Sequence, residues 1–504
     1  MLKIGWSKRD ISTNKPVVIA GQMYIRISEG ILDPIMLTAL TIENEGDYVI
    51  FLSSDTGGIY DKILDEVRAA VKAKNPLIDT QKIVMNATHT HSAPYVGKGD
   101  ITGTWGSLKN LPHDGVEITP PGEYMEFYID MATEAVCESF ENRREGYIAY
   151  GYGHATTGHS RRSVYTKDWG SEGTAKMSRT VNGHAKMYGN TNDPAFSHYE
   201  AGMDSYSNFL YTFDENKKLT GAVVNVPCPS QTCAHERLIS ADYWHDVREI
   251  LCERHGEIFV LAQCAAAGDL CPEPPHYHKA RKRRYSLKYA DMHVDERIDR
   301  PSMMHHRRDI ALRICDSFDE VYSWATKEFF SDIPIVHSVK TIELSRRSIP
   351  RDEYETAVRD LKEIEESLSF DNNGNTLDEV IANSKKLAAG NRCRNVISKY
   401  EEQTDSPTYS MELHVIKIGE IAFATNTFEL YMDYQHRIQA RSPFEQTFIV
   451  QLCGAVGKRN GTYLATKRAV WGKGYSATIY CNMVSSEGGQ ELVEETVEEL
   501  MQIY

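Results

Sequence analysis

Residues 83–94 read Ile83-Val84-Met85-Asn86-Ala87-Thr88-His89-Thr90-His91-Ser92-Ala93-Pro94, and this stretch decides the fold that we expect. Its three leading apolar residues, two of them β-branched, predict a short buried strand that stops before Pro94. Side chains alternate between the two faces of an extended segment, so His89 and His91 would point the same way. Two imidazoles at a strand end supply half of a transition-metal site, although two polar histidines in a turn explain the pattern equally well.

The composition is that of a globular protein with room for two or three domain-sized cores. The chain has 504 residues, of which 41% are hydrophobic and 25% charged. A net charge of −15 disfavours binding to nucleic acid or to an anionic membrane. No run of 18 apolar residues and no signal-like N-terminus occurs, so we expect a cytoplasmic protein without a membrane anchor, with homo-oligomerisation left open. The ten cysteines show no Cys-x-x-Cys pair and read as reduced thiols.

Strand and helix patterns alternate in the first part of the chain. Residues 49–52 read as a buried strand, residues 61–75 as an amphipathic helix, and the strand at residue 83 follows. This order predicts an α/β layer. Asp55 follows the first of these strands and is a metal ligand, a partner of a ligating histidine, or a helix cap.

The rest of the chain divides softly into three regions. Residues 1–340 hold most of the strand patterns, and residues 341–410 are charged with a helical period and read as a helical hairpin. Residues 411–504 return to strands and a closing helix. We expect the first and third regions to form one catalytic domain, into which the helical region is inserted.

Four motifs, in order, resemble those of the neutral/alkaline non-lysosomal ceramidases. Residues 86–94 resemble the family's T-H-T-H-S-G-P motif, in which the first histidine is a zinc ligand and the second lines the site. The segment around Glu429 resembles its P-G-E motif, whose glutamate binds zinc, and that around Tyr463 its G-Y-x-P-T motif, whose tyrosine completes the coordination. Residues 471–475, Trp-Gly-Lys-Gly-Tyr, resemble its G-G-Y-E turn.

Two further segments resemble the family and also depart from it. In the segment that ends in Arg161 and Arg162, Ser160 stands where the family has asparagine. Residues 262–272 resemble the family's strand and loop that end in G-D-x-x-P, but Cys264 and Ala265 occupy the places of a serine pair. The loss of the serine puts ceramide itself in doubt as the substrate.

The most consequential departure is at Pro229, which stands where the family has its second zinc histidine. Proline cannot bind a metal ion, so the site is altered or a neighbour supplies the ligand. His235 and His245 are the nearest candidates, and we prefer His245.

The resemblance implies an α/β (α+β) fold of two β-sheet layers flanked by helices, without the family's C-terminal immunoglobulin-like domain. It also implies one divalent metal ion, zinc or else manganese, held by His89, Glu429 and Tyr463 with His245 or His91. His91 or Asp55 would take a proton, and the groups that stabilise negative charge would be Arg161, Tyr463 and Tyr475. The residues that we expect to bind substrate are Arg162, Gln231, Asp269 and Trp471.

Three functions remain open at this point. One is hydrolysis of an amide in a small polar N-acyl compound, which the family implies most directly. The second is metal-dependent cleavage of a carbohydrate or glycoside, favoured by polar and aromatic loop residues. The third is a degenerate, metal-free binding protein, suggested by Pro229.

A basic run, Lys279-Ala280-Arg281-Lys282-Arg283-Arg284, stands out in this acidic chain. It reads as a solvated surface or an interface with an acidic patch. The sharper interpretation is a contact with an anionic group of the substrate.

Overall fold

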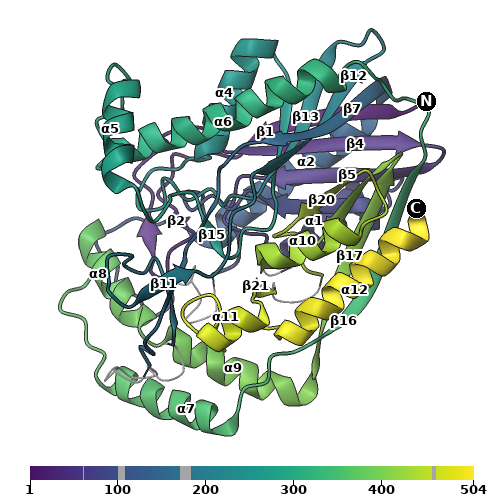
Figure 1. The fold of residues 1–504 in the computed structure, drawn as a ribbon. Coiled ribbons are helices and arrows are strands. Elements are labelled where there is room, and N and C mark those ends of the chain that lie inside the picture. Colours follow the sequence, from purple (N-terminus) through teal and green to yellow (C-terminus); the bar gives the residue numbers. More distant parts are fainter. Residues whose placement is uncertain (61, 100–107, 171–182, 457–460) are drawn as a thin grey trace.

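The computed structural model describes residues 1–60, 62–99, 108–170, 183–456 and 461–504. The fold consists of four layers: helices, an eight-stranded sheet, a four-stranded sheet and a second set of helices (Figure 1). Both termini lie on the same side of the molecule (Figure 1).

The larger sheet is mixed and has the order β14-β13-β12-β7-β1-β4-β5-β6. Within the described part of this sheet, the two edge pairs, β5–β6 and β13–β14, run parallel and the other pairs run antiparallel. Its strands are β1 (Lys3–Asp10), β4 (Met36–Asn44), β5 (Asp47–Ser54), β6 (Ile83–Ala87), β7 (Arg144–His154), β12 (Tyr206–Asp214), β13 (Leu219–Val226) and β14 (Phe259–Cys264).

The smaller sheet packs face to face on the larger one and has the order β16-β17-β18-β20. Its strands are β16 (Ile335–Ser345), β17 (Thr408–Ile418), β18 (Ile421–Thr425) and β20 (Gln446–Val450). The alternation of side chains along β5 shows the layering directly. Val49 and Phe51 lie in the core between the sheets, where Phe51 meets Phe423, and Ile50 and Leu52 lie in the core under the helices.

Six helices cover the outer faces of the two sheets. Apolar residues of α1 (Ile63–Lys74), α2 (Pro121–Glu141), α4 (Tyr243–His255) and α6 (Pro301–Ala325) share a core with the larger sheet. Those of α10 (Met432–Arg441) and α12 (Ser486–Ile503) share a core with the smaller one. None of the helices in the described ranges combines the length and the hydropathy that a bilayer crossing requires.

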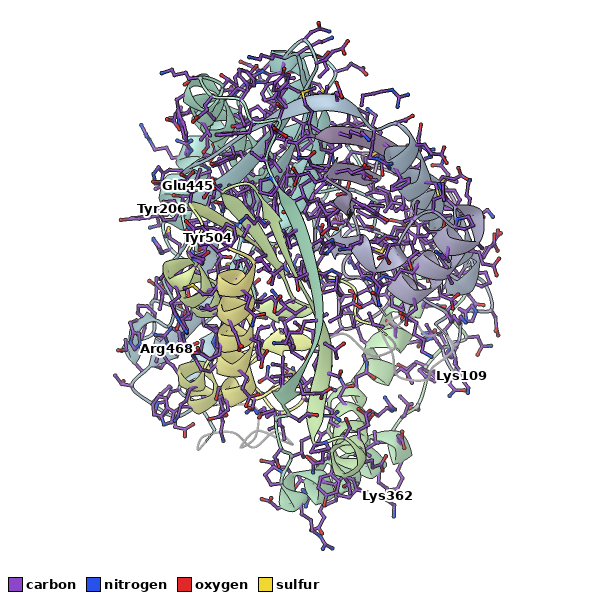
Figure 2. The ribbon with its side chains drawn as sticks, turned by 90° about the vertical axis from the view of Figure 1, so that its right-hand side faces the viewer. Lys109, Tyr206, Lys362, Glu445, Arg468 and Tyr504 are labelled. Carbon is purple, nitrogen blue, oxygen red and sulfur yellow. The ribbon has the colours of Figure 1, made fainter. Side chains whose placement is uncertain are left out.

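The region between β16 and β17 forms three helices, whereas the sequence predicts a hairpin of two. They are α7 (Arg351–Glu366), α8 (Leu377–Ala388) and α9 (Asn391–Asp405), and they lie together at one end of the molecule, where Lys362 points outward (Figures 1 and 2). The boundary expected near residue 340 falls inside β16, which pairs with β17 along its whole length. The inserted segment is therefore a long connection between two neighbouring strands.

The remaining elements are short and surround the strand ends. They are β2 (Val18–Ile19), β3 (Arg26–Ile27), the 3₁₀ turn Thr80–Lys82, β8 (His159–Ser160), β9 (Arg162–Tyr165), β10 (Ala185–Met187), β11 (Phe196–Tyr199), β15 (Leu270–Cys271), α5 (His278–Lys288), β19 (Phe428–Leu430), β21 (Thr462–Leu464) and α11 (Lys467–Gly472). The described part of residues 164–205, a polar and glycine-rich segment, contains β10, β11 and the end of β9.

A buried ionic network ties α1 to the smaller sheet. Arg68 Nη2 donates to Glu412 Oε1 at 2.7 Å, and His414 Nε2 lies 2.9 Å from the same oxygen. Burial alone would raise the pKa of Glu412, but the hydrogen bonds from His414 and Arg68 outweigh it and lower that pKa to about 2. All ten cysteines are free, and nine of them are buried.

Candidate active site

The candidate site forms where several strands end together. β6 ends at Ala87, just before His89, and β13 and β14 lead into the segments after Val226 and Cys264. β19 and β21 pair in parallel with Glu429 opposite Tyr463, so the two side chains share a face. The parallel register of β19 and β21 thus brings together two side chains that lie 34 residues apart in the sequence.

His89 lies at the centre of the site and has an unusual backbone conformation. Its φ of 65° is in the left-handed region, so the segment is a turn and not the extended strand that the sequence predicts. Its Nδ1 lies 2.6 Å from the carbonyl oxygen of Gly57, which fixes the proton on Nδ1. Nε2 is left with its lone pair free, 3.4 Å from Glu429 Oε2 and 3.3 Å from His91 Nε2.

His91 is half-buried beside His89, with the two rings edge to face at a centroid distance of 4.8 Å. Its Nε2 also lies 3.0 Å from Gln231 Nε2. Burial lowers the pKa of His91 well below 6.5, and the charges of His89, Arg26 and Arg161 lower it further. His91 is therefore neutral at pH 7.

The side chains of Glu429, Tyr463 and Arg161 interact with one another, and Glu429 also interacts with His89. Burial favours the protonated form of Glu429, but His89, Arg161 and a hydrogen bond from Tyr463 hold its pKa below the ordinary value. Burial and the Glu429 charge raise the pKa of Tyr463 well above 10, so the phenol keeps its proton and donates it to Glu429. The Arg161 guanidinium lies over the Tyr463 ring at 5.4 Å. Tyr475 meets the same ring at 5.6 Å.

Arg161 is almost fully buried and only partly satisfied. Its Nη2 donates to the carbonyl oxygen of Gly268 at 2.8 Å, and it also bonds the phenol of Tyr188. Its Nε has no hydrogen-bond partner. Burial lowers the pKa of Arg161, but Tyr463, Tyr188 and Glu429 raise it above its ordinary value, so the guanidinium stays charged. A buried cation with a free donor is suited to bind an oxygen of a ligand.

The donor types suit a divalent ion, although the set is incomplete. Within the described ranges, no group of three or more His, Cys, Asp or Glu side chains is arranged to hold a metal ion. Nε2 of His89 nevertheless lies 3.3 and 3.4 Å from an imidazole nitrogen and a carboxylate oxygen. Ligand bonds of about 2.1 Å in a tetrahedral zinc site separate ligand atoms by about 3.4 Å, so two of these separations fit.

Comparison with known proteins rests on solved structures, because no family model and no curated protein matches the sequence. The neutral ceramidase from Pseudomonas aeruginosa superposes with a TM-score of 0.65 at 15% identity, over 100% of this chain and 74% of that one. A ceramidase complexed with C2 superposes with a TM-score of 0.64 at 17% identity, over 100% of this chain and 75% of that one.

The fold is ceramidase-like. The predicted resemblance and the two sheet layers flanked by helices are thereby confirmed. At these identities the similarity concerns the fold alone, and the chemistry has to be argued from the side chains.

Within this ceramidase-like fold, three of the predicted site residues are engaged in the scaffold. Asp55 is buried and accepts two hydrogen bonds from Arg248, at 2.6 and 3.1 Å, and one from the Met36 amide. Arg162 is fully buried and binds Glu200 through two hydrogen bonds of 2.9 Å. Among the described contacts, neither Asp55 nor Arg162 has a side-chain hydrogen bond to His89, His91 or Glu429, and the roles predicted for them stay predictions.

Asp269 is the third of these residues and supports the site from behind. Its carboxylate accepts a hydrogen bond from the Met432 amide at 3.0 Å, and its carbonyl oxygen accepts one from the Arg161 amide. Burial raises the pKa of Asp269 to about 6. Asp269 therefore helps to position the backbone of Arg161, and its predicted contact with a substrate stays a prediction.

The described contacts do not connect His245 with the cluster around His89, so its role in place of the family histidine at Pro229 stays a prediction. His245 lies in the first turn of α4 and, among the described contacts, has no side-chain hydrogen bond to His89, His91 or Glu429. His235 is exposed, and it is near enough for its charge to lower the pKa of His91. The nearest side chain to His91 from this segment is Gln231, two residues after Pro229.

Cys264 is buried in the protein interior, whereas Trp471 lies at the surface. Cys264 is fully buried, and burial raises its pKa to about 12, so it is a packed thiol and no nucleophile. Trp471 is 68% exposed and stacks on His184, with ring centroids 4.8 Å apart and planes inclined by 1°. This exposed pair forms a flat aromatic surface.

Three residues of the site were missed by sequence reasoning. Gly57 supplies the carbonyl that orients His89, and Tyr188 bonds Arg161 from the long polar segment. Gln451 Oε1 accepts from the amides of Leu430 and Ala267, which flank Glu429 and Gly268. The glycine pair after Asp55 was a signal for a close approach, but no pattern marks Tyr188 or Gln451.

Proposed function

We propose that the protein is a metal-dependent hydrolase that cleaves an amide bond in a small polar N-acyl compound. One observation carries the proposal: Nε2 of His89, freed by the Gly57 carbonyl, lies 3.3–3.4 Å from both His91 and Glu429. A backbone carbonyl on the far nitrogen is the usual support of a metal-ligating histidine. The ceramidase-like fold agrees with a hydrolase.

His89 and Glu429 are the residues that would hold the ion, zinc in the first instance, with Tyr463 and His91 beside them. When bound, such an ion supplies a Lewis acid that polarises a carbonyl group and lowers the pKa of water to about 7. Tyr463 holds the Glu429 carboxylate in place by its hydrogen bond. Because Pro229 brings no donor, we propose that the protein supplies fewer ligands than the family pattern does.

The remaining groups match the needs of amide hydrolysis. His91, neutral because of its lowered pKa, would take the proton of the attacking water and pass it to the leaving amine. Arg161 would donate its free Nε–H to the amide oxygen as negative charge develops there. Gln231, at 3.0 Å, would hold the His91 ring in position.

Polar side chains around the cluster favour a polar substrate over a lipid. Arg161, Tyr188 and Gln231 are hydrogen-bonding groups, and Cys264 stands in the place of a serine that the resemblance assigns to the site. A small N-acyl amino sugar or a similar compound has the hydroxyl groups and the amide that such groups bind.

A second candidate is cleavage of a carbohydrate or glycoside. It is favoured by the exposed Trp471–His184 pair, because flat aromatic surfaces of this kind support sugar rings. A third candidate is a metal-free binding protein, favoured by Pro229 and by the lack of three converging ligands in the described ranges. The three candidates differ in products and in metal content.

The test is product analysis on p-nitrophenyl glycosides of N-acetylglucosamine and on free N-acetyl amino sugars, with and without added zinc. Release of acetate from the wild type, its loss with a chelator and in Glu429→Gln, and its retention in His245→Ala would support the amidase. Release of nitrophenol would support the glycosidase. Binding of the sugars without any product, with or without zinc, would support the binding protein and contradict the first proposal.

A further inference from the structure

A basic hollow lies between α5 and the N-terminal half of α6. The two helices lie together at a corner of the molecule (Figure 1). Its volume is about 860 Å³. Five cationic side chains line it, together with Tyr277, Tyr285 and the imidazole of His159. The cations are Arg281, Arg283, Arg284, Lys288 and Arg313. Most of the cationic side chains of the basic run, residues 279–284, thus line the hollow.

The acidic groups at the hollow do not neutralise these cations. Asp309 is shared by three of them, since Arg284 and Lys288 donate to Oδ1 at 2.9 and 2.8 Å and Arg313 lies 3.3 Å from Oδ2. Arg281 pairs with Glu273. Two carboxylates against five cations leave a surplus of three positive charges in a chain whose net charge is −15. Such a local inversion of sign concentrates anions.

The charge of Arg283 is available to a ligand. Its side chain is exposed and, within the described ranges, has no hydrogen bond or ion pair. Arginine presents a planar set of donors that matches the oxygens of a carboxylate, phosphate or sulfate group. Arg283 and Arg284 together therefore offer one free guanidinium and one that Asp309 holds in place.

The side of the hollow formed by β8 contains unsatisfied polar atoms. His159 is 9% exposed and its Nδ1 has no hydrogen-bond partner. An unpaired buried polar atom of this kind is costly unless a ligand or bound water satisfies it. His159 lines the hollow, and Arg161 of the candidate active site lies two residues further along the chain. The hollow and the candidate active site thus lie on the same short segment.

We propose that this hollow binds an anionic group, a carboxylate, phosphate or sulfate, carried by a small molecule whose ring or apolar part lies against Tyr277 and Pro274. The guanidinium groups of Arg283 and Arg284 hold the anion, and His159 donates a further hydrogen bond. This binding site is separate from the His89 cluster and does not depend on a metal ion there.

The test is isothermal titration of the full chain at pH 7 and low salt with four probes: inorganic phosphate, inorganic sulfate, phenyl phosphate and benzoate. We expect saturable binding at one site. Phenyl phosphate should bind more tightly than inorganic phosphate, and the affinity should be about tenfold weaker in Arg283→Ala. Comparison of the probes separates phosphate and sulfate from carboxylate as the source of the charge.

Lys282→Ala is the matched control, because Lys282 is the exposed cation next to Arg283 on α5 and does not line the hollow. Its affinity should equal that of the wild type. His89→Ala should also keep its affinity, which makes this result independent of the proposed hydrolase. Absence of saturable binding for all four probes, equal weakening by Lys282→Ala, or loss of binding in His89→Ala would each overturn the proposal.

Discussion

Replacement of Arg162 by alanine should destabilise the protein, because this side chain is part of the scaffold. The guanidinium is 0% exposed and binds Glu200 through Nε and Nη2, both at 2.9 Å. It also donates to the carbonyl oxygens of Tyr475 and Lys473, at 2.8 and 2.7 Å. The variant leaves the buried Glu200 carboxylate without its ion-pair partner and removes hydrogen bonds to three backbone carbonyl oxygens. Loss of one partner from a buried ion pair costs about 3–5 kcal/mol.

For a chain of 504 residues this cost corresponds to a fall in Tm of about 3–5 °C, because the unfolding entropy is about 1 kcal/mol/K at that length. Differential scanning calorimetry measures it. Arg468→Ala is the control, since Arg468 is an exposed arginine on α11 (Figure 2) and its removal should change Tm by less than about 0.5 °C. The double variant Arg162→Met/Glu200→Leu should recover most of the loss. A fall of less than 1 °C in Arg162→Ala would refute the scaffold role.

Two substitutions and one labelling experiment test other parts of the structure. Glu412→Gln should lower the unfolding free energy by about 2 kcal/mol at pH 7, after discounting for screening, because the folded pKa of Glu412 is about 2 against 4.5. This stabilisation is present above pH 4.5 and is lost as the pH falls toward 2, so urea titrations of both proteins should converge in that window. Iodoacetamide at pH 8 should label the partly exposed Cys252 long before the buried Cys264, because burial raises the pKa of Cys264 to about 12. A peptide map measures the two labelling rates, and equal rates would contradict the burial of Cys264. Gln451→Ala should weaken zinc binding by about 10- to 100-fold in a competition titration, because it frees the backbone beside Glu429, and unchanged affinity would remove Gln451 from the site.

Much of the fold was predictable because short sequence patterns decide local structure. The strands at residues 49–52 and before residue 88 and the helix near residues 61–75 occur within a few residues of their expected bounds. The order of the motifs also indicated the ceramidase-like architecture. The inserted region was harder, because a two-residue turn, Ala389-Gly390, divides its second half into α8 and α9.

The candidate site was predictable only in part, since its geometry depends on contacts between distant segments. The prediction that His89 and His91 lie together assumes an extended strand, whereas the left-handed turn at His89 produces the same proximity by another route. Arg161 and Arg162 are neighbours in the sequence, yet Glu200 draws one into the scaffold and leaves the other beside Tyr463. No pattern around either arginine predicts which of them faces the site.

The most direct test of the central claim is the metal content of the purified protein by elemental mass spectrometry, with His89→Ala and His245→Ala alongside. We expect about one equivalent of zinc or another divalent ion in the wild type and in His245→Ala, and its loss in His89→Ala. No metal in the wild type, even after incubation with zinc or manganese, would contradict it.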